Sequence, residues 1–272
     1  MPIEYINLFR ESLFSKGCYL KRFIVVTGAS RGLGEALAKI FMNADNFVLG
    51  ISRNSNAELI DFASTNGFKY EELCLDLSQH ASFDSISTEF KNKYFVNNDY
   101  DEYILINNAG VLEPIALLSK MDLKDLIFNL EVNVVGALGL INCFISSLEN
   151  FEVQKVVVNV SSGAGRNPYE GWSAYCASKS ALDMFSKCIA LEEKRKPFGA
   201  NIYSISPGVI ETTMQDTIRS KTIDEFPMIN KFLDLKENNL LKSPQEVAEK
   251  FKAFIDLKVK SHEVVFNLYD LI

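Results

Sequence analysis

A tyrosine, a lysine and a serine near the middle of the chain have the types and spacing needed to move a proton. Tyr175 and Lys179 lie four positions apart at the start of a helical pattern, and Ser162 follows a run of β-branched residues at 156–160. Positions i and i+4 share one face of a helix, so the ammonium group can lie beside the phenol. The cation is expected to lower a phenol pKa that is normally about 10, which makes Tyr175 a better proton donor at neutral pH.

A Tyr-x-x-x-Lys pair alone is weak evidence, because chance pairs place a half-exposed ring beside a solvated amine in many helices. The strand-end serine strengthens the catalytic interpretation, and a glycine-rich turn near the N-terminus strengthens it further. Residues 23–26 have the pattern of a buried strand and residues 35–43 that of a helix, with the sequence TGASRGLG between them. Glycines let the backbone approach a pyrophosphate, and the free N–H groups of a helix start attract it. A tight turn without a ligand is the structural alternative.

The second predicted strand, residues 47–51, is followed by Arg53. In dinucleotide-binding folds an acid at this place holds the ribose 2′-hydroxyl, whereas a basic residue accommodates a 2′-phosphate. No acid occurs between residues 47 and 54, and Arg31 in the glycine turn can reach the same phosphate. Two guanidinium groups suit a phosphate dianion better than a neutral diol. The sequence therefore favours NADP(H) over NAD(H), with two solvated arginines as the alternative.

Ligand-binding motifs also follow the next predicted strands: Asp76-Leu77 after residues 73–75, and Asn107-Asn108-Ala109-Gly110 after residues 103–106. Open α/β sheets bind ligands at this end of their strands. Asn133 lies inside an apolar segment, residues 122–148, that is predicted to form one long helix. A buried amide needs partners, and those of Asn133 are either backbone and water or a proton path.

Strand and helix patterns alternate along the chain, which predicts a single doubly wound parallel sheet of about seven strands with helices on both faces. Residues 1–22 stand apart as an N-terminal extension, and residues 23–272 form the Rossmann-type domain that carries the site. Pro207-Gly208 opens an irregular region of the kind that forms lids or substrate walls. The candidate pocket walls, which could equally be core residues, are Tyr169, Trp172, Met214 and Phe226.

The composition argues against several classes of function. The 272-residue chain has a net charge of −7 and a pI near 5.1, which disfavour binding to nucleic acid or to anionic membranes. No uninterrupted apolar run approaches the roughly 20 residues that a membrane span needs. Five cysteines without CxxC spacing and only two histidines argue against a Cys/His metal site and suit a reducing cytoplasm.

Taken together, the motifs resemble those of the short-chain dehydrogenases/reductases over about residues 23–270. The resemblance rests on TGASRGLG, DL at 76, NNAG at 107, Asn133, the set Ser162, Tyr175 and Lys179, and PG at 207. The segments SSGAGRNPYEGWSAYCASK and PGVIETTMQ, with NNLLKSPQEVA, look like the sepiapterin-reductase-like branch. Within it they look most like benzil reductases, which form (S)-benzoin from a 1,2-diketone.

The resemblance implies an NADPH-dependent carbonyl reductase in which Tyr175 is the general acid. Lys179 would lower the tyrosine pKa and hold the nicotinamide ribose, and Ser162 would polarise the substrate carbonyl. Asn133 would anchor a water that links Lys179 to solvent. Besides Tyr175 and Lys179, the residues implied to line the cofactor are Gly28, Ser30, Arg31, Gly32, Leu33, Arg53, Asp76, Leu77, Asn108, Ala109, Gly110, Pro207, Gly208, Val209 and Thr212.

One position departs from the branch. Sepiapterin reductases carry an acid shortly before a Tyr-Asp pair near the C-terminus, where this chain has Asn267 before Tyr269 and Asp270. An amide cannot supply that charge, which argues against pterins. The resemblance to benzil reductases implies instead an apolar, aromatic ketone or 1,2-diketone as the substrate. Pterin reduction is the alternative enzymatic function, and NADPH sensing without turnover is a non-enzymatic one. Since the family usually assembles through two long helices, a homodimer or homotetramer through residues 122–148 and 174–194 is also expected.

Overall fold

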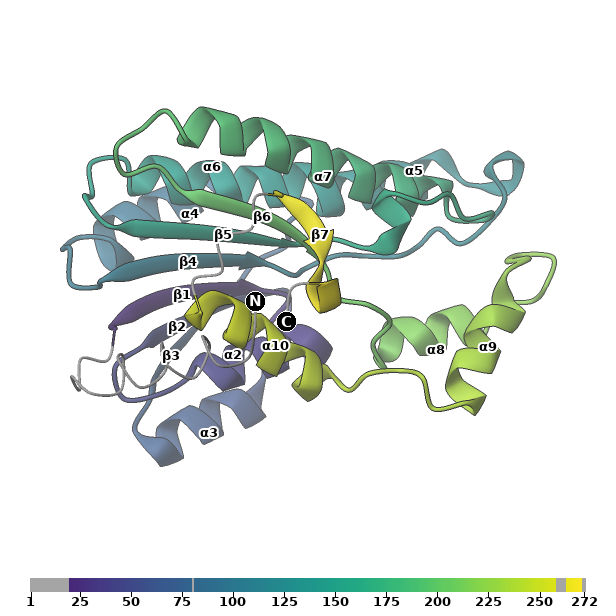
Figure 1. Cartoon of the computed structure of the whole chain (residues 1–272), viewed down its shortest axis with the longest axis horizontal. Coiled ribbons are helices and arrows are strands. Elements are labelled where there is room, and N and C mark those ends of the chain that lie inside the picture. Colours follow the sequence, from purple (N-terminus) through teal and green to yellow (C-terminus); the bar gives the residue numbers. More distant parts are fainter. Residues whose placement is uncertain (1–19, 80, 258–262, 271–272) are drawn as a thin grey trace.

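The computed structural model describes residues 20–79, 81–257 and 263–270, and their strands form one seven-stranded parallel sheet. The strand order is β3-β2-β1-β4-β5-β6-β7, with helices on both faces (Figure 1). The predicted doubly wound α/β fold is thus confirmed. The strands are β1 (Arg22–Thr27), β2 (Phe47–Ser52), β3 (Lys69–Cys74), β4 (Glu102–Asn107), β5 (Gln154–Val160), β6 (Asn201–Ser206) and β7 (Val265–Asn267). Most of the predicted extension, residues 1–22, lies outside the described residues.

Each face of the sheet has its own core, because successive strand residues point to opposite faces. In β1, Ile24 and Val26 pack against α2 (Gly32–Phe41), α3 (Ala57–Asn66) and α10 (Pro244–Asp256). The alternate residues Phe23 and Val25 pack with α4 (Ser82–Glu89) and α6 (Ala137–Ser147) on the other face. Figure 1 shows α7 (Ser173–Glu193) on the same side of the sheet as α4 and α6.

The long helix predicted for residues 122–148 is continuous but changes its winding in the middle. It consists of α5 (Leu123–Leu130), the π-helical turn η3 (Glu131–Gly136) and α6. Turns of this kind are rare, and those that do occur are often found at functional sites. The turn η3 contains Asn133. By length and composition Leu123–Ser147 could cross a membrane, with a mean hydropathy of 1.6. Its residues Leu140 and Phe144 are instead buried against the sheet, which identifies it as a core helix.

Three local predictions differ from the structure. The helix α3 was not predicted. It buries only Leu59 and Ala63, so its apolar residues do not repeat regularly enough to indicate a helix. The third strand begins at Lys69 rather than at residue 73, since an edge strand tolerates the polar side chains of Glu71 and Glu72. The region after Pro207, predicted to be irregular, contains α8 (Thr213–Arg219) and α9 (Ile229–Glu237), which project beyond the sheet in Figure 1.

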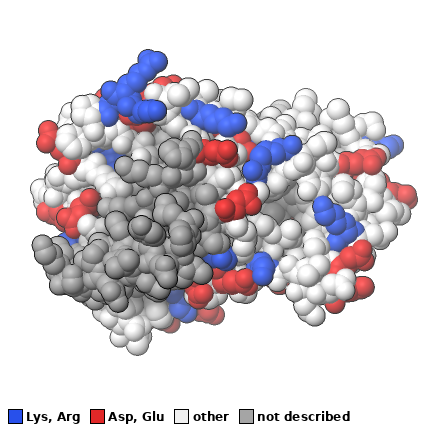
Figure 2. Space-filling model, in the orientation of Figure 1, with Lys and Arg blue, Asp and Glu red and all other residues white. Residues whose placement is uncertain are grey.

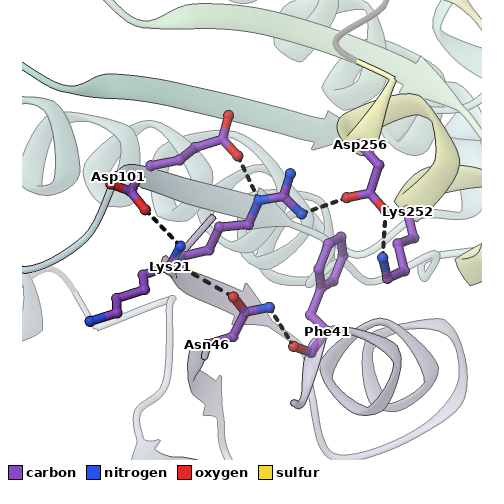
Figure 3. Close-up of polar contacts among 8 residues, drawn as sticks. Lys21, Phe41, Asn46, Asp101, Lys252 and Asp256 are labelled. Atoms are coloured by element: carbon purple, nitrogen blue, oxygen red, sulfur yellow. Dashed lines mark hydrogen bonds and ion pairs between the residues drawn. The ribbon is translucent and has the colours of Figure 1, made fainter. Parts of the chain in front are cut away.

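Charged side chains of both signs are interspersed on the face shown in Figure 2. A more deeply placed ionic cluster lies where β1 and β4 begin (Figure 3). The side chain of Arg22 is 9% exposed and donates to Glu102, which is 1% exposed, over 2.7 Å. A second nitrogen of Arg22 donates to Asp256 of α10 over 2.5 Å. The cluster therefore connects two central strands with a covering helix.

Replacing Arg22 with methionine is expected to lower the free energy of unfolding by about 3 kcal/mol, because it takes the guanidinium away from a buried carboxylate. Urea unfolding measures this change. Lys93→Met is the control, since the Lys93–Glu71 pair is 53% and 43% exposed and should contribute less than about 1 kcal/mol. Equal losses in the two variants would contradict the structural role of the cluster.

Candidate active site

A cavity of about 600 Å³ lies at the carboxyl ends of the central strands. Most of the site residues predicted from the sequence line it. It borders the ends of β1 and β4, where the strand order reverses and α/β sheets bind ligands. All predicted cofactor residues line it: Gly28, Ser30, Arg31, Gly32, Leu33, Arg53, Asp76, Leu77, Asn108, Ala109, Gly110, Tyr175, Lys179, Pro207, Gly208, Val209 and Thr212. Ser162, Tyr169, Trp172 and Met214 line it as well. Asn133 and Phe226 do not belong to its lining.

The glycine-rich turn has the geometry of a phosphate cradle. Gly28 and Gly32 have positive φ angles of 68° and 59°, which favour glycine. A Cβ at Gly28 would lie 3.0 Å from the Cα of Ala109, so a side chain would fill the space between the turn and the next motif. The N-cap of α2 is Arg31, whose side chain makes no capping hydrogen bond. The first N–H groups of α2 are therefore available to an anion.

The residues expected to surround the adenosine half lie at the other end of the cavity. Arg31 and Arg53 are both exposed, and within the described ranges neither guanidinium group makes an ion pair or hydrogen bond. Asp76 accepts from the backbone N–H and the hydroxyl of Ser78 over 3.0 and 2.9 Å, which orients its carboxylate at the strand end. The residues present fit a dinucleotide, with two guanidinium groups at the border of this end of the cavity.

Tyr175, Lys179 and Ser162 converge at the inner wall of this cavity. Tyr175 and Lys179 are 8% and 5% exposed on α7, and the Nζ atom of Lys179 lies 5.7 Å from the centre of the tyrosine ring. Lys179 donates to the carbonyl of Val160, the last residue of β5, over 2.9 Å. The Ser162 side chain lies close enough to the phenol to act on its pKa. A strand end and one helix face thus position the three groups together, as the spacing predicted.

The expected lowering of the Tyr175 pKa is wrong for this state of the protein. Burial raises the pKa of the phenol to about 12, and the hydrogen bond from Ser162 opposes that effect only in part. Lys179 is itself buried, and desolvation lowers its pKa to about 8. The sequence argument assumed a solvated pair, whereas removing both groups from water disfavours both charged forms. Tyr175 is therefore a protonated donor throughout the neutral range.

The side chain of Asn133 is hydrogen-bonded within the protein. This was one of the two alternatives left open by the sequence, the other being a role in a proton path. Its amide accepts from the N–H of Val111 over 2.8 Å and donates to the carbonyl of the same residue over 2.7 Å. It also donates to Asn129, a fully buried residue that the sequence reading missed. Asn129 in turn donates to the carbonyl of Glu113 over 2.7 Å. The two amides lie one turn apart on the helix and hold the loop that follows Gly110. Their i, i+4 spacing is the sequence feature that could have indicated a role for Asn129.

The part of the cavity next to Tyr175 is apolar and aromatic. Tyr169, Trp172 and Met214 line it, as the sequence predicted. Phe226 was predicted to be a wall residue as well, but it is fully buried behind Trp172, with the two rings stacked 4.9 Å apart. Phe232, from the region predicted to form a lid or wall, also lines it, and three side chains that the sequence did not indicate complete the wall: Leu112, Ile218 and Leu235. They come from distant segments, so no local spacing pointed to them.

The comparisons with known proteins agree with this geometry. The sequence profile of the family described as short chain dehydrogenase matches residues 22–223. The chain belongs to the short-chain dehydrogenase family. It is 34% identical to benzil reductase ((S)-benzoin forming) of Bacillus cereus, over 86% of this chain and 94% of that protein. It is 30% identical to the sepiapterin reductase of Rattus norvegicus, over 74% of this chain and 78% of that protein.

Solved structures of this family share the fold. A short-chain dehydrogenase/reductase from Saccharomyces cerevisiae is 26% identical, with a TM-score of 0.75 over 92% of this chain and 99% of that one. The short-chain dehydrogenase is thus an oxidoreductase that interconverts an alcohol and a carbonyl with a nicotinamide cofactor. Among the described residues no group of three or more His, Cys, Asp or Glu side chains could hold a metal ion.

Proposed function

We propose that the protein is an NADPH-dependent carbonyl reductase in which Tyr175 protonates the carbonyl oxygen of the substrate. The observation that carries this proposal is the convergence of Tyr175, Ser162 and Lys179 in a cavity that continues into the glycine-rich turn. A bound nicotinamide cofactor would supply the hydride. The chain's own residues supply a proton, hydrogen-bond donors and an apolar chamber.

We assign a separate task to each group. The Ser162 hydroxyl lines the cavity together with Tyr175, and its proposed task is to donate to the carbonyl oxygen and to stabilise negative charge that develops there. Tyr175 transfers its proton to the same oxygen as the alkoxide forms. Lys179 provides a positive charge near the resulting phenolate, 5.7 Å from the ring centre. We also propose a proton path that involves Lys179 and Asn133, because both side chains approach Gly110: a Cβ there would lie 3.6 and 3.2 Å from them.

NADPH is the proposed cofactor because of Arg31 and Arg53. Both side chains border the adenosine end of the cavity, and β2 ends in Ser52 with no acid before Asn54. A 2′-phosphate would receive charge-assisted hydrogen bonds there, whereas a 2′-hydroxyl would lack the carboxylate acceptor that it usually has.

The proposed substrate is an aromatic ketone or 1,2-diketone, as the name of the Bacillus cereus relative suggests. The aromatic wall supports this choice, and the surroundings of Asn267 weigh against pterins. Arg166 donates to the side-chain oxygen of Asn267 over 2.6 Å, while the amide nitrogen of Asn267 donates to Asp270 over 2.9 Å. The Arg166 guanidinium thus already occupies the acceptor oxygen that the N–H donors of a pterin edge would need, and a guanidinium offers no acceptor of its own.

Loss of NADPH absorbance with benzil, other diketones and sepiapterin tests the proposal, with NADH run in parallel. We expect turnover of benzil with NADPH and little turnover of sepiapterin. Reduction of sepiapterin alone would replace the substrate assignment with pterin reduction. Tight NADPH binding without turnover of any carbonyl would favour the sensing function instead.

We also propose a homodimer or a homotetramer, in a reducing compartment such as the cytoplasm. The outer faces of α5 and α7 expose apolar side chains, among them Leu123 and Ile127 at 67% and 44% and Met184 and Phe185 at 59% and 43%. Exposed apolar stripes on two helices favour association. Light scattering should give at least twice the monomer mass at micromolar concentration, and Phe185→Glu should lower it. A monomeric parent protein would refute the proposal.

A further inference from the structure

Asp183 is a buried carboxylate that the mechanism above does not use. It lies on α7 one turn after Lys179, and both residues are 5% exposed. One carboxylate oxygen accepts from the hydroxyls of Ser161 and Ser204, each over 2.6 Å. The other oxygen is buried and has no hydrogen-bond partner among the described residues. A buried charge is costly unless it is compensated, so the presence of a carboxylate at this buried position needs an explanation.

Its contacts place Asp183 at the junction of the elements that build the site. Ser161 directly precedes Ser162 at the end of β5, and Ser204 belongs to β6. The short turn η4 (Gly163–Gly165) packs on the same carboxylate, since a Cβ at Gly165 would lie 2.7 Å from its second oxygen. Asp183 therefore holds the strand end and the turn that flank Ser162.

The same carboxylate lies one helical turn from the buried lysine. The ammonium of Lys179 donates to the carbonyl of Val160 and approaches Gly110, and both of these partners are uncharged. Tyr175, on the same helix face, is protonated at neutral pH. Burial lowers the Lys179 pKa to about 8, and the charge of Asp183 opposes this effect. Lys187, one turn beyond Asp183, is exposed to solvent.

We propose that Asp183 is a positioning residue, which fixes the turn carrying Ser162 and supplies the negative charge that keeps Lys179 protonated inside the fold. The proposal rests on the proposed reductase function for its effect on rate. Its electrostatic part does not, because the charge state of Lys179 can be measured without turnover.

The test is the titration of Lys179 in the cofactor-free protein, followed by NMR of ¹³C-labelled lysine side chains and assigned by the signal that Lys179→Met removes. Asp183→Asn keeps the shape and the acceptor oxygen but removes the charge. We expect the Lys179 pKa to fall by about one unit or more, the effect of one nearby opposite charge. In the rate profile, activity that needs the ammonium form should then decline at a correspondingly lower pH.

Two control variants separate charge from structure. Ser204→Ala removes a hydrogen bond and keeps the charge, so it should lower stability without moving the Lys179 titration. Glu192→Gln makes the same chemical change at an exposed position of α7 and should move neither. An unchanged Lys179 pKa in folded Asp183→Asn would overturn the proposal. Should that variant not fold, a Lys179 pKa well below 8 in the parent protein would overturn it as well. A shifted titration in a protein that reduces no carbonyl would support the proposal and reject only the reductase function.

Discussion

Tyr175→Phe is expected to lower kcat for carbonyl reduction about 10²- to 10⁴-fold, the range that a positioned general acid contributes. The substitution removes a single oxygen from a ring that is held edge-to-face against Trp172 at 5.8 Å, so the fold should persist. The affinity for NADPH should remain nearly unchanged, because the glycine-rich turn and the two arginines are untouched. A loss confined to kcat would identify the phenol as the proton donor.

Steady-state kinetics with benzil, together with NADPH binding followed by fluorescence, measures both quantities. Tyr169→Phe is the matched control. Tyr169 lines the same cavity and loses the same hydroxyl, but it precedes α7 and does not share a helix face with Lys179. Its kcat should stay close to that of the parent protein. Full activity in Tyr175→Phe would refute the mechanism, and a parallel loss of NADPH binding would mean that the phenol acts in binding instead.

Removing both guanidinium groups near the adenosine end is expected to abolish the preference for NADPH. Hydrogen bonds to charged groups contribute about 1.5–3 kcal/mol each, and the exposed Arg31 and Arg53 should lie at the low end. The double variant Arg31→Ala, Arg53→Ala should therefore lose about 3 kcal/mol, or roughly 10²-fold in kcat/KM with NADPH. The value with NADH should change little, because a 2′-hydroxyl carries no charge for the arginines to pair with.

The measurement is kcat/KM for each cofactor at low and at high salt, since exposed charge pairs are screened by salt. Arg195→Ala, an exposed arginine in the turn after α7, controls for the general loss of a surface charge. Equal use of NADH and NADPH by the parent protein would contradict the assignment of the two arginines. A single variant with the full effect would assign the phosphate contact to that arginine alone.

The sequence by itself determined the features that depend on local chemistry. Residues 27–34 predicted the cradle because only glycine adopts positive φ without strain, as Gly28 and Gly32 do. The alternation of strand and helix patterns predicted the parallel sheet. The spacing of Tyr175 and Lys179 predicted one shared helix face. Each of these inferences needs only neighbouring residues, and the structure agrees with all of them.

The tertiary structure decided whatever depends on burial and on contacts between distant segments. A pattern cannot reveal that Tyr175 and Lys179 are both removed from water, which raises the pKa of one and lowers that of the other. It could not place Phe226 behind Trp172 rather than in the wall. It also could not show that Asp183 meets hydroxyls from two different strands. Desolvation and long-range packing are properties of the assembled fold, so residues far apart in the chain acquire these roles only when the sheet brings them together.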